Sequence, residues 1–168
     1  MTSEGHWHSA VVYQVYWRSF KDGNGDGIGD LKGLRSKIGY LSSLGVDAIW
    51  LNPTYPSPQG DHGYDVSNYF DVDPLFGTLE ELEQAIDEFH DHGMAVLLDI
   101  VPNHVSSQHP WFISAKEGGH GHEAESRFII RQGKGDSGGI PPNDWKSVFG
   151  GPAWSKFPTE AGLSLIHI

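Results

Sequence analysis

Cysteine, basic residues and long apolar runs are scarce or absent in this sequence of 168 residues. The absence of cysteine excludes disulfide bonds and thiolate chemistry. Only 11 Lys and Arg stand against 22 Asp and Glu, a formal net charge of −11 that disfavours binding to nucleic acid or to an anionic membrane. No apolar run approaches the roughly 20 residues that cross a bilayer, and no basic segment with an apolar core marks a secretory signal at the N-terminus. We therefore expect a cytoplasmic protein with no nucleic-acid or membrane partner.

Three segments are typical of strands in a parallel sheet. Residues 11–17 and 47–51 are rich in apolar, β-branched and aromatic side chains. Residues 95–101 are apolar except for Asp99 and follow a helix-ending glycine, which predicts a strand covered on both faces. Pro102 ends that strand because it lacks the N–H that the ladder needs. Asp99 requires a polar partner if it is buried within this run.

Two amphipathic helices are predicted between these strands. Asp30 can cap the first helix, which Gly45 ends. Thr78 and Glu81 form a capping box for the second helix, which Gly93 ends. Each helix has one apolar face with residues spaced three or four apart: Leu31, Leu34, Ile38, Leu41 and Leu44 in the first, and Leu79, Leu82, Ile86 and Phe89 in the second. The order β-α-β-α-β predicts a parallel sheet with right-handed crossovers.

The loops point to one architecture. Both strand-to-helix loops are long, and loops beyond about 12 residues are usually functional, whereas both helix-to-strand links are short. This is the layout of a (β/α)₈ barrel, which places its ligands at the carboxyl ends of the strands, where Asn103 and His104 follow the third strand. A closed barrel needs about 250 residues. We therefore expect an α/β fold, the N-terminal part, about three βα units, of a TIM barrel.

The composition changes after His104 and becomes rich in Gly, Pro and Trp, with a strand candidate at residues 126–131. We expect residues 1–104 to form the N-terminal portion of the barrel. Residues 105–162 are expected to form an incomplete subdomain inserted after the third strand. Residues 163–168 do not continue the preceding pattern, and we expect them to be a non-native tail.

The glycine-rich loop at residues 22–30 has the ligand spacing of a calcium-binding loop. Side-chain oxygens occupy its first, third, fifth and ninth positions, with Gly at the sixth and a backbone carbonyl at the seventh. The usual glutamate at position twelve is replaced by Gly33, and a strand rather than a helix precedes the loop. The alternative is a polar turn that binds no ion. We expect a structural Ca²⁺ or Mg²⁺ ion held by Asp22, Asn24, Asp26, the Ile28 carbonyl and Asp30.

A second polar loop contains Asp61, Tyr64 and Asp65. An aromatic face beside carboxylates suits a sugar ring, because the C–H face packs on the aromatic ring and an ionised carboxylate accepts hydrogen bonds from hydroxyls. The alternative is a turn with solvated acids in which Tyr64 packs within the loop. His104 can likewise bond a hydroxyl, act as a base or serve a structural role.

These motifs together resemble the N-terminal third of glycoside hydrolase family 13, in particular its α-glucosidase and oligo-1,6-glucosidase branch. The resemblance runs from about Trp7 to Trp154. Its matching segments are residues 12–16, 22–31, 45–50, 61–65, 99–104, 141–145 and 149–154.

The resemblance implies a role for each of these site residues. Asp61 would anchor a hydroxyl of a terminal glucose, Tyr64 would stack on that ring and His104 would bond its 6-hydroxyl. Phe149 would border the same pocket. Asp22, Asn24, Asp26, the Ile28 carbonyl and Asp30 would be the ligands of the calcium or magnesium ion. Asp65, Asp99 and Asn103 would support the sugar-binding residues.

The resemblance also implies that the chemistry lies elsewhere in the intact enzyme. The nucleophilic Asp, the acid/base Glu and a third Asp of this family come from later strands, so no catalytic residue is expected among these 168 residues. The intact enzyme is expected to be a retaining α-glucosidase acting on terminal non-reducing glucose of α-glucoside oligosaccharides, and this fragment alone is expected to be inactive. Trehalose synthase, sucrose isomerase and a non-catalytic glucosidase-like ectodomain are the alternatives.

Overall fold

The structure is a computed structural model that describes residues 6–118, 126–131, 133–136, 138–148, 150–156 and 163–165. Two compact units make up the chain. Met1–Tyr64 with Asn68–Val101 form the first unit, and Asp65–Ser67 with Pro102–Ile168 form the second. The expected division into barrel, inserted subdomain and tail stays a prediction.

A parallel three-stranded sheet organises the first unit. Its strands β1 (Val12–Val15), β2 (Ala48–Leu51) and β3 (Ala95–Leu98) lie in the order β1-β2-β3. They run parallel, as the β-α-β-α-β pattern predicted. The register pairs Gln14 with Trp50 and Trp50 with Leu97. All three strands are shorter than expected, and residue 17, placed at the end of the first strand, instead begins helix α1 (Trp17–Phe20).

The predicted first helix is two helices, α2 (Leu31–Arg35) and α3 (Ile38–Ser43). The break falls at Ser36, whose hydroxyl donates to the Gly33 carbonyl at 2.6 Å, while Lys37 N–H donates to the Leu34 carbonyl at 2.9 Å. These short-range bonds tighten the chain and end α2. Of the predicted apolar face, Leu31, Leu34, Ile38 and Leu41 are buried, whereas Leu44 is exposed.

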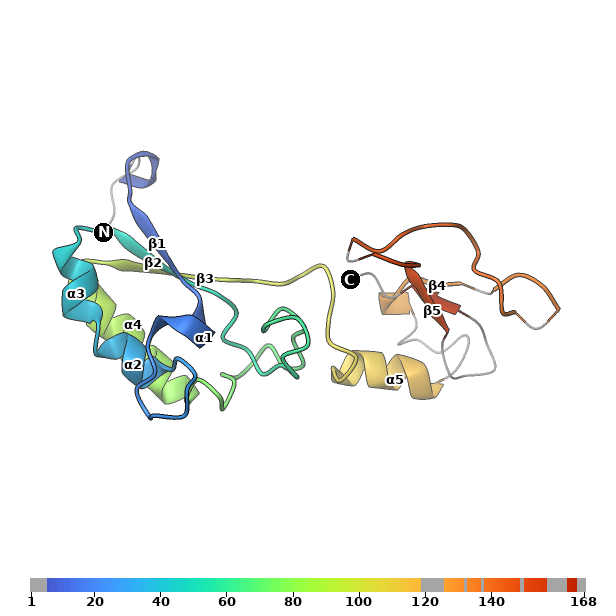
Figure 1. Cartoon of the computed structure of the whole chain (residues 1–168), viewed down its shortest axis with the longest axis horizontal. Coiled ribbons are helices and arrows are strands. Elements are labelled where there is room, and N and C mark those ends of the chain that lie inside the picture. Colours follow the sequence, from blue (N-terminus) through green and yellow to red (C-terminus); the bar gives the residue numbers. More distant parts are fainter. Residues whose placement is uncertain are drawn as a thin grey trace. The chain divides into compact units, whose positions relative to one another are not determined.

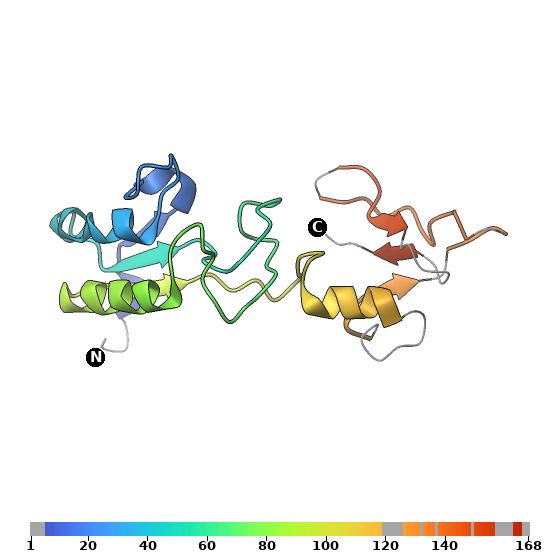
Figure 2. The same ribbon diagram turned by 90° about the horizontal axis from the view of Figure 1, so that it is seen from below.

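The predicted second helix is α4 (Leu79–Asp91), and its capping box is confirmed. Glu81 N–H donates to Thr78 Oγ1 at 3.2 Å, and Thr78 N–H donates to Glu81 Oε2 at 2.9 Å. Helices α2, α3 and α4 lie together on one side of the sheet (Figures 1 and 2). The first and last of the predicted apolar residues differ in burial, since Leu79 is exposed and Phe89 is fully buried.

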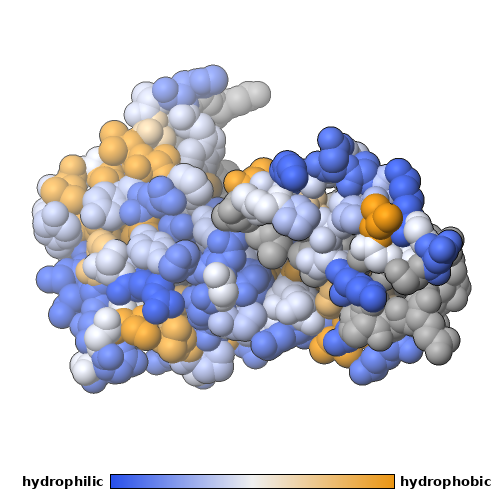
Figure 3. All heavy atoms as spheres, turned by 45° about the vertical axis from the view of Figure 1, so that its right-hand side comes forward, coloured by the Kyte–Doolittle hydropathy of each residue, from blue (hydrophilic) through white to orange (hydrophobic). Residues whose placement is uncertain are grey.

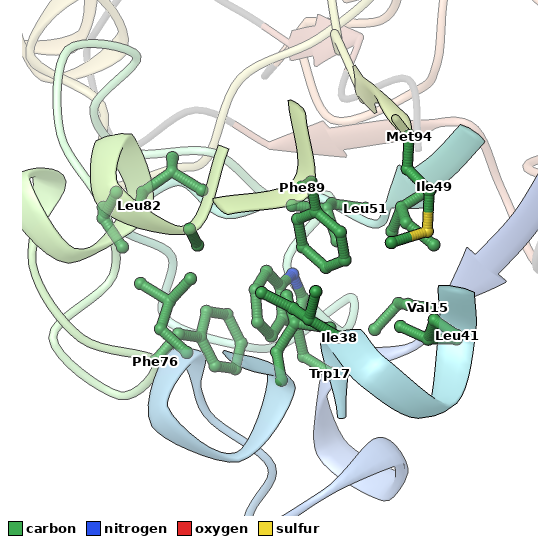
Figure 4. Packing of buried hydrophobic residues seen from close by; sticks show 14 residues of the cluster. Val15, Trp17, Ile38, Leu41, Ile49, Leu51, Phe76, Leu82, Phe89 and Met94 are labelled. Atoms are coloured by element: carbon green, nitrogen blue, oxygen red, sulfur yellow. The ribbon is translucent and has the colours of Figure 1, made fainter. Parts of the chain in front are cut away.

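The core of the first unit lies between this sheet and these helices (Figure 4). Trp17 stacks on Phe76 with ring centroids 5.1 Å apart and an interplanar angle of 17°. Phe89 of α4 and Ile49 and Leu51 of β2 are each at most 1% exposed. Burial of side chains of this size contributes about 1.5–3 kcal/mol each. Close packing of the strands on the helices therefore holds the strand ends in fixed positions.

The opposite face of the sheet is not covered in this unit, so the expectation that residues 95–101 form a strand buried on both faces is wrong here. Side chains alternate along strands, so the register places Val12, Trp50 and Leu97 on the face away from the helices. They are 41%, 36% and 37% exposed. The reason is that no described element of the first unit packs on this face. Figure 3 shows apolar side chains among hydrophilic ones on the surface.

The second unit contains helix α5 (Pro110–Gly118) and three short strands, β4 (Ile130–Arg131), β5 (Trp154–Lys156) and β6 (Leu163–Leu165). The strands pair antiparallel in the order β4-β6-β5. The expected strand at residues 126–131 is reduced to its last two residues. Three residues of the expected tail form β6, while its origin stays a prediction.

Among the described residues, no helix is both long enough and apolar enough to span a membrane.

Candidate functional site

Polar side chains meet where the three parallel strands of the first unit end. Asn52 directly follows β2, and Asp99 directly follows β3. Tyr64 joins them, because its hydroxyl donates to Asp99 Oδ2 at 2.9 Å and accepts from Asn52 Nδ2 at 2.9 Å. Gln14 of β1 extends the chain of hydrogen bonds by donating to Asn52 Oδ1 at 3.2 Å. The carboxyl ends of all three strands thus share one hydrogen-bonded network, the Tyr64 network.

The Tyr64 phenol is a neutral donor within this network. Burial is the largest cause that raises the pKa of Tyr64, to about 12, and the hydrogen bond to Asp99 and the charge of Asp99 raise it as well. The bond from Asn52 lowers the same pKa, because it stabilises the phenolate, and the charge of Asp61 raises it. The Tyr64 hydroxyl therefore keeps its proton at neutral pH and directs it to Asp99.

A tight turn places Asp61 and Tyr64 next to each other. Tyr64 N–H donates to the Asp61 carbonyl at 2.9 Å, and the two residues between them, His62 and Gly63, have φ of 52° and 100°. Positive φ at both central residues is the signature of a type I′ turn. The imidazole of His62 is held by the hydroxyl of Tyr16, 3.2 Å from its Nδ1. The turn thus brings Asp61, the predicted anchor of a sugar hydroxyl, next to Tyr64, on which the sugar ring is predicted to stack.

Asp99 has the partners that its place in an apolar strand required. Trp50 Nε1 donates to Asp99 Oδ1 at 2.8 Å, and Tyr55 Oη donates to the Asp99 carbonyl at 3.0 Å. Neither Trp50 nor Asn52 was predicted as a site residue from the sequence. Asn52 could have been predicted as a site residue, because it is polar and directly follows an apolar strand. Trp50 could not, because its place in the apolar strand is typical of a core residue.

The remaining predicted site residues belong to the second unit or lie outside the described residues. His104 is half-buried, with its Nδ1 3.2 Å from Nδ2 of its neighbour Asn103. Asp65 is half-buried, and Val66 beside it accepts a backbone hydrogen bond from Ser106 at 2.8 Å. Phe149 lies outside the described residues. The structure therefore groups Asp61, Tyr64 and Asp99, and the roles of all these residues stay predictions.

Hydrogen bonds within the predicted cation-binding loop, residues 22–30, hold its conformation. Asp22 accepts N–H bonds from Gly25 at 2.6 Å and Gly27 at 2.8 Å, and these bonds lower its pKa. Gly25 and Gly27 have φ of 90° and 91°, a conformation that other residues rarely adopt. The loop oxygens accept two further short N–H bonds, from Asp26 to Asn24 Oδ1 and from Ile28 to Asp26 Oδ1, both at 2.8 Å.

The end of the loop is tied to α2. The Asp30 carboxylate caps this helix by accepting the Gly33 N–H at 2.6 Å, and it also accepts the Gly23 N–H at 3.2 Å. Gly33 is needed at its position because a Cβ there would lie 1.9 Å from the Lys21 carbonyl oxygen. Any residue with a side chain at position 33 would therefore clash with the backbone of Lys21.

The donor set of the loop fits a hard cation, since it consists of three carboxylates, one amide oxygen and one carbonyl. Within the part of the chain that the structure describes, however, no group of three or more His, Cys, Asp or Glu side chains converges closely enough to hold a metal. The cation site therefore stays a prediction.

The fold and the Tyr64 network define a class of protein: an α/β chain with its polar cluster at the carboxyl ends of parallel strands, where such folds bind ligands. Residues 14–161 match the family model of the alpha amylase catalytic domain. The chain therefore belongs to the α-amylase catalytic-domain family, glycoside hydrolase family 13, whose catalytic domains are TIM barrels, as its motifs indicated.

Named relatives support the same branch of the family. The chain is 48% identical over 154 residues to a probable alpha-glucosidase of Rhizobium meliloti (strain 1021), covering 92% of this chain and 27% of the relative. It is 47% identical over 162 residues to the probable oligo-1,6-glucosidase 3 of Bacillus subtilis (strain 168), covering 96% and 28%.

A solved structure of a MutB mutant in complex with its substrate sucrose superposes with a TM-score of 0.91 at 46% identity. The match covers 99% of this chain and 29% of the MutB chain. The chain thus spans less than a third of the length of the proteins that it matches.

Proposed function

We propose that this chain forms the glucose-binding, N-terminal part of a retaining α-glucosidase that hydrolyses terminal non-reducing α-linked glucose from oligosaccharides. The names of its relatives support this activity. The observation that carries the proposal is the Tyr64 network, a neutral aromatic side chain hydrogen-bonded at the strand ends beside Asp61. The finer fold that we propose is three βα units of a TIM barrel with the start of a subdomain inserted after β3.

The proposed sugar contacts follow from the chemistry of each side chain. The face of Tyr64 packs against the C–H face of the glucose ring, and the Asp61 carboxylate accepts hydrogen bonds from ring hydroxyls. A carboxylate that anchors the last ring favours a chain end over an internal sugar, so we propose an exo-acting enzyme. His104 bonds the 6-hydroxyl, Phe149 borders the pocket, and Asp65, Asp99 and Asn103 support these contacts.

The bond-breaking groups are proposed to lie outside this chain. A retaining glycosidase needs two carboxyl groups about 5–5.5 Å apart, one as nucleophile and one as acid and base. We propose that the catalytic Asp, Glu and Asp belong to the remaining length of the relatives, which has no counterpart here. Residues of this chain bind and orient the sugar, and none of them acts as the nucleophile or proton donor.

The first experiment tests turnover. The gene that contains this sequence is expressed at its full length, and the protein is assayed with p-nitrophenyl α-glucoside and isomaltose. We expect hydrolysis with retention of the anomeric configuration, and no turnover by the 168-residue chain alone. Asp61→Asn is expected to raise KM strongly because it removes the charged acceptor, whereas Asp87→Asn, an exposed position on α4, leaves KM unchanged.

Each of three results would contradict the proposal. These are turnover by the 168-residue chain alone, a full-length protein with no activity on α-glucosides, and an Asp61→Asn variant with unchanged KM.

Sucrose isomerisation and trehalose synthesis are the nearest alternative reactions. MutB, whose structure superposes closely on this chain, is a trehalulose synthase. Product analysis with sucrose distinguishes the reactions, since an isomerase yields an isomeric disaccharide and a hydrolase yields glucose and fructose. A trehalose synthase would convert maltose to trehalose, and a non-catalytic glucosidase-like ectodomain would bind sugar without turnover.

We also propose that the loop at residues 22–30 holds one structural Ca²⁺ or Mg²⁺ ion. Asp22, Asn24, Asp26, the Ile28 carbonyl and Asp30 supply oxygen ligands of the kind that these cations prefer. The lowered pKa of Asp22 keeps that carboxylate ionised at neutral pH. Bound there, the ion would stabilise the connection between the end of α1 and the start of α2 without taking part in the reaction.

Calorimetric titration of Ca²⁺ and of Mg²⁺ into the metal-free chain tests this site. We expect one binding event that Asp22→Asn abolishes, because this substitution removes a charged ligand. Asp87→Asn is the matched control and keeps the binding. Heat of binding that persists in Asp22→Asn, or no heat in the unsubstituted chain with either cation, would contradict the proposed site.

A further inference from the structure

Trp50 makes a polar contact that its place in the sheet does not require. It is the third residue of β2, lies on the face away from the helices and is 36% exposed. An indole at such a position can leave its N–H to solvent. Instead, Trp50 Nε1 donates to Asp99 Oδ1 at 2.8 Å across 49 residues of sequence, from the middle strand of the sheet to the end of its neighbour β3.

This contact completes the set of bonds that orient the Asp99 side chain. The second carboxylate oxygen, Oδ2, accepts the Tyr64 hydroxyl at 2.9 Å. The backbone of the same residue is fixed from both sides, since Asp99 N–H donates to the Leu51 carbonyl at 3.3 Å and its own carbonyl accepts Tyr55 Oη at 3.0 Å. With its backbone held, the remaining freedom of Asp99 is rotation of its side chain.

That rotation is the freedom that Trp50 removes. The terminal torsion of an aspartate is broad and roughly two-fold, so one hydrogen bond alone leaves the carboxylate free to swing. A second donor on the other oxygen fixes the plane of the carboxylate. The oxygen that receives the Tyr64 hydroxyl is then held in one place relative to β2.

The geometry points to Trp50 as a positioning residue for Tyr64: its indole N–H fixes the Asp99 carboxylate, and Asp99 fixes the Tyr64 hydroxyl. Because the proposed function makes Tyr64 the platform for a glucose ring, this inference rests on that function and deepens it. Trp50 itself is assigned no contact with the sugar.

Asn52 provides the second hydrogen bond that holds the Tyr64 hydroxyl. It is 7% exposed and donates to the Tyr64 hydroxyl oxygen at 2.9 Å, while Trp17 Nε1 donates to its backbone carbonyl at 2.9 Å. The Tyr64 hydroxyl is thus held between two side chains anchored on β2 and β3. Hydrogen bonds to a phenol lie at its oxygen edge, so they fix the ring without using its faces, which a stacked sugar needs.

A purely structural role for Trp50 is the competing explanation. An indole on a sheet face contributes packing through its ring, and phenylalanine supplies most of that packing. Replacement of Trp50 by Phe removes the N–H donor while keeping an aromatic ring, so it separates the two roles.

The first test uses the unsubstituted chain. The Trp50 indole N–H and the Tyr64 ζ-carbon are followed by NMR with isotope-labelled Trp and Tyr, and they are assigned by their absence in Trp50→Phe and Tyr64→Phe. We expect Asp99→Asn to shift both resonances, and Tyr64→Phe to shift the Trp50 indole N–H, because the two donors share one carboxylate. A Trp50 indole N–H that Tyr64→Phe leaves in place, or a shift of only one resonance in Asp99→Asn, would overturn the proposal even if Trp50→Phe fails to fold.

The second test compares variants at alkaline pH. In the unsubstituted chain Tyr64 is expected to ionise near its pKa of about 12. In Trp50→Phe this pKa is expected to fall, because a freely rotating Asp99 holds the phenol proton less well, while burial, the largest cause of the raised pKa, remains. Trp145→Phe, which alters an exposed indole of the second unit, is the matched control and leaves the Tyr64 titration unchanged. An unchanged titration in Trp50→Phe would refute the positioning role.

These readouts need no turnover, so they separate the two proposals. Absence of α-glucosidase activity in the full-length protein would reject the proposed function and leave the NMR result standing. Independent behaviour of Trp50 and Tyr64 would reject the positioning role while the activity remained.

Discussion

Asn52 illustrates how single polar residues are accommodated next to the core. Its side chain bonds Gln14 and Tyr64, its carbonyl accepts the Trp17 indole N–H, and its own N–H donates to the Val15 carbonyl at 3.2 Å. Buried polar groups are stable only when they have such partners. Each of these hydrogen bonds reaches a residue that is distant in sequence or on another strand. They can therefore form together only when the strands of the sheet are correctly assembled.

His62 carries the least favourable backbone conformation in the turn that precedes Tyr64, with φ of 52°. His62→Val and His62→Asn both remove the imidazole and its contact with Tyr16, so their difference isolates the backbone. Asn tolerates positive φ and a β-branched residue does not. We expect Val to be less stable than Asn by about 1 kcal/mol, measured by urea unfolding. Equal stabilities would mean that the turn does not retain this conformation in solution.

Helix α4 shows how much of an element is specified locally. Its start is fixed by two reciprocal hydrogen bonds between Thr78 and Glu81, and the C-terminal glycine Gly93 has φ of 77°. Both signals act over three or four residues and were therefore visible in the sequence. The break between α2 and α3 was not predicted, because the apolar spacing continues through it and Ser36 and Lys37 carry no strong stop signal.

Removal of the capping side chain of α4 provides a test at the scale of the element. Thr78→Ala is expected to cost about 1 kcal/mol of unfolding free energy, since it leaves the Glu81 N–H without its acceptor. Thr78→Ser keeps the hydroxyl and is expected to stay near the unsubstituted stability. Urea unfolding followed by circular dichroism measures both variants. An Ala variant as stable as the Ser variant would show that the cap contributes nothing.

Helices α2 and α4 are joined by a long-range ion pair. Arg35 of α2 and Glu88 of α4 lie 53 residues apart in sequence, with Arg35 Nε 3.0 Å from Glu88 Oε2. The hydrogen bonding of Arg35, the donor, to the Glu88 carboxylate is the main cause that lowers the pKa of Glu88, and it is also the main cause that raises the pKa of Arg35. Their side chains are 31% and 39% exposed, so solvent weakens the pair to about 0.5 kcal/mol.

The pH dependence of stability follows from the sign of these shifts. The Glu88 contribution is present above its ordinary pKa of 4.5 and is lost as the pH falls through the lower pKa of the folded state. Arg35 loses its contribution only above its raised pKa, at strongly alkaline pH. We expect Glu88→Gln to have a smaller loss of stability on acidification than the unsubstituted chain, measured by urea unfolding at neutral and acid pH.

Glu83→Gln, an exposed position on the same helix, is the control and should keep the full acid sensitivity. Identical acid profiles for Glu88→Gln and the unsubstituted chain would show that the ion pair does not form in solution.

At the scale of the whole molecule, the first unit is covered on one face of its sheet only. Val12, Trp50 and Leu97 remain on the other face, which was expected to be buried. The apolar pattern of β3 correctly predicted a strand. Such a pattern does not indicate, however, which element packs on each face of the sheet. The relatives are more than three times as long as the matched segment, in keeping with a sheet that is one part of a larger fold.

The sequence by itself determined the β-α-β-α-β pattern of the first unit, the parallel sheet, the capping box of α4 and the family, because these depend on short-range spacing and on motifs that stay contiguous in the chain. The tertiary structure alone decided that Tyr64 is held by Asp99, 35 residues away, and that Asp99 is held by Trp50, 49 residues away. Hydrogen bonds between such distant residues depend on strand register and on the path of the loops. Those are set by the packing of the whole sheet against its helices rather than by any local stretch of sequence.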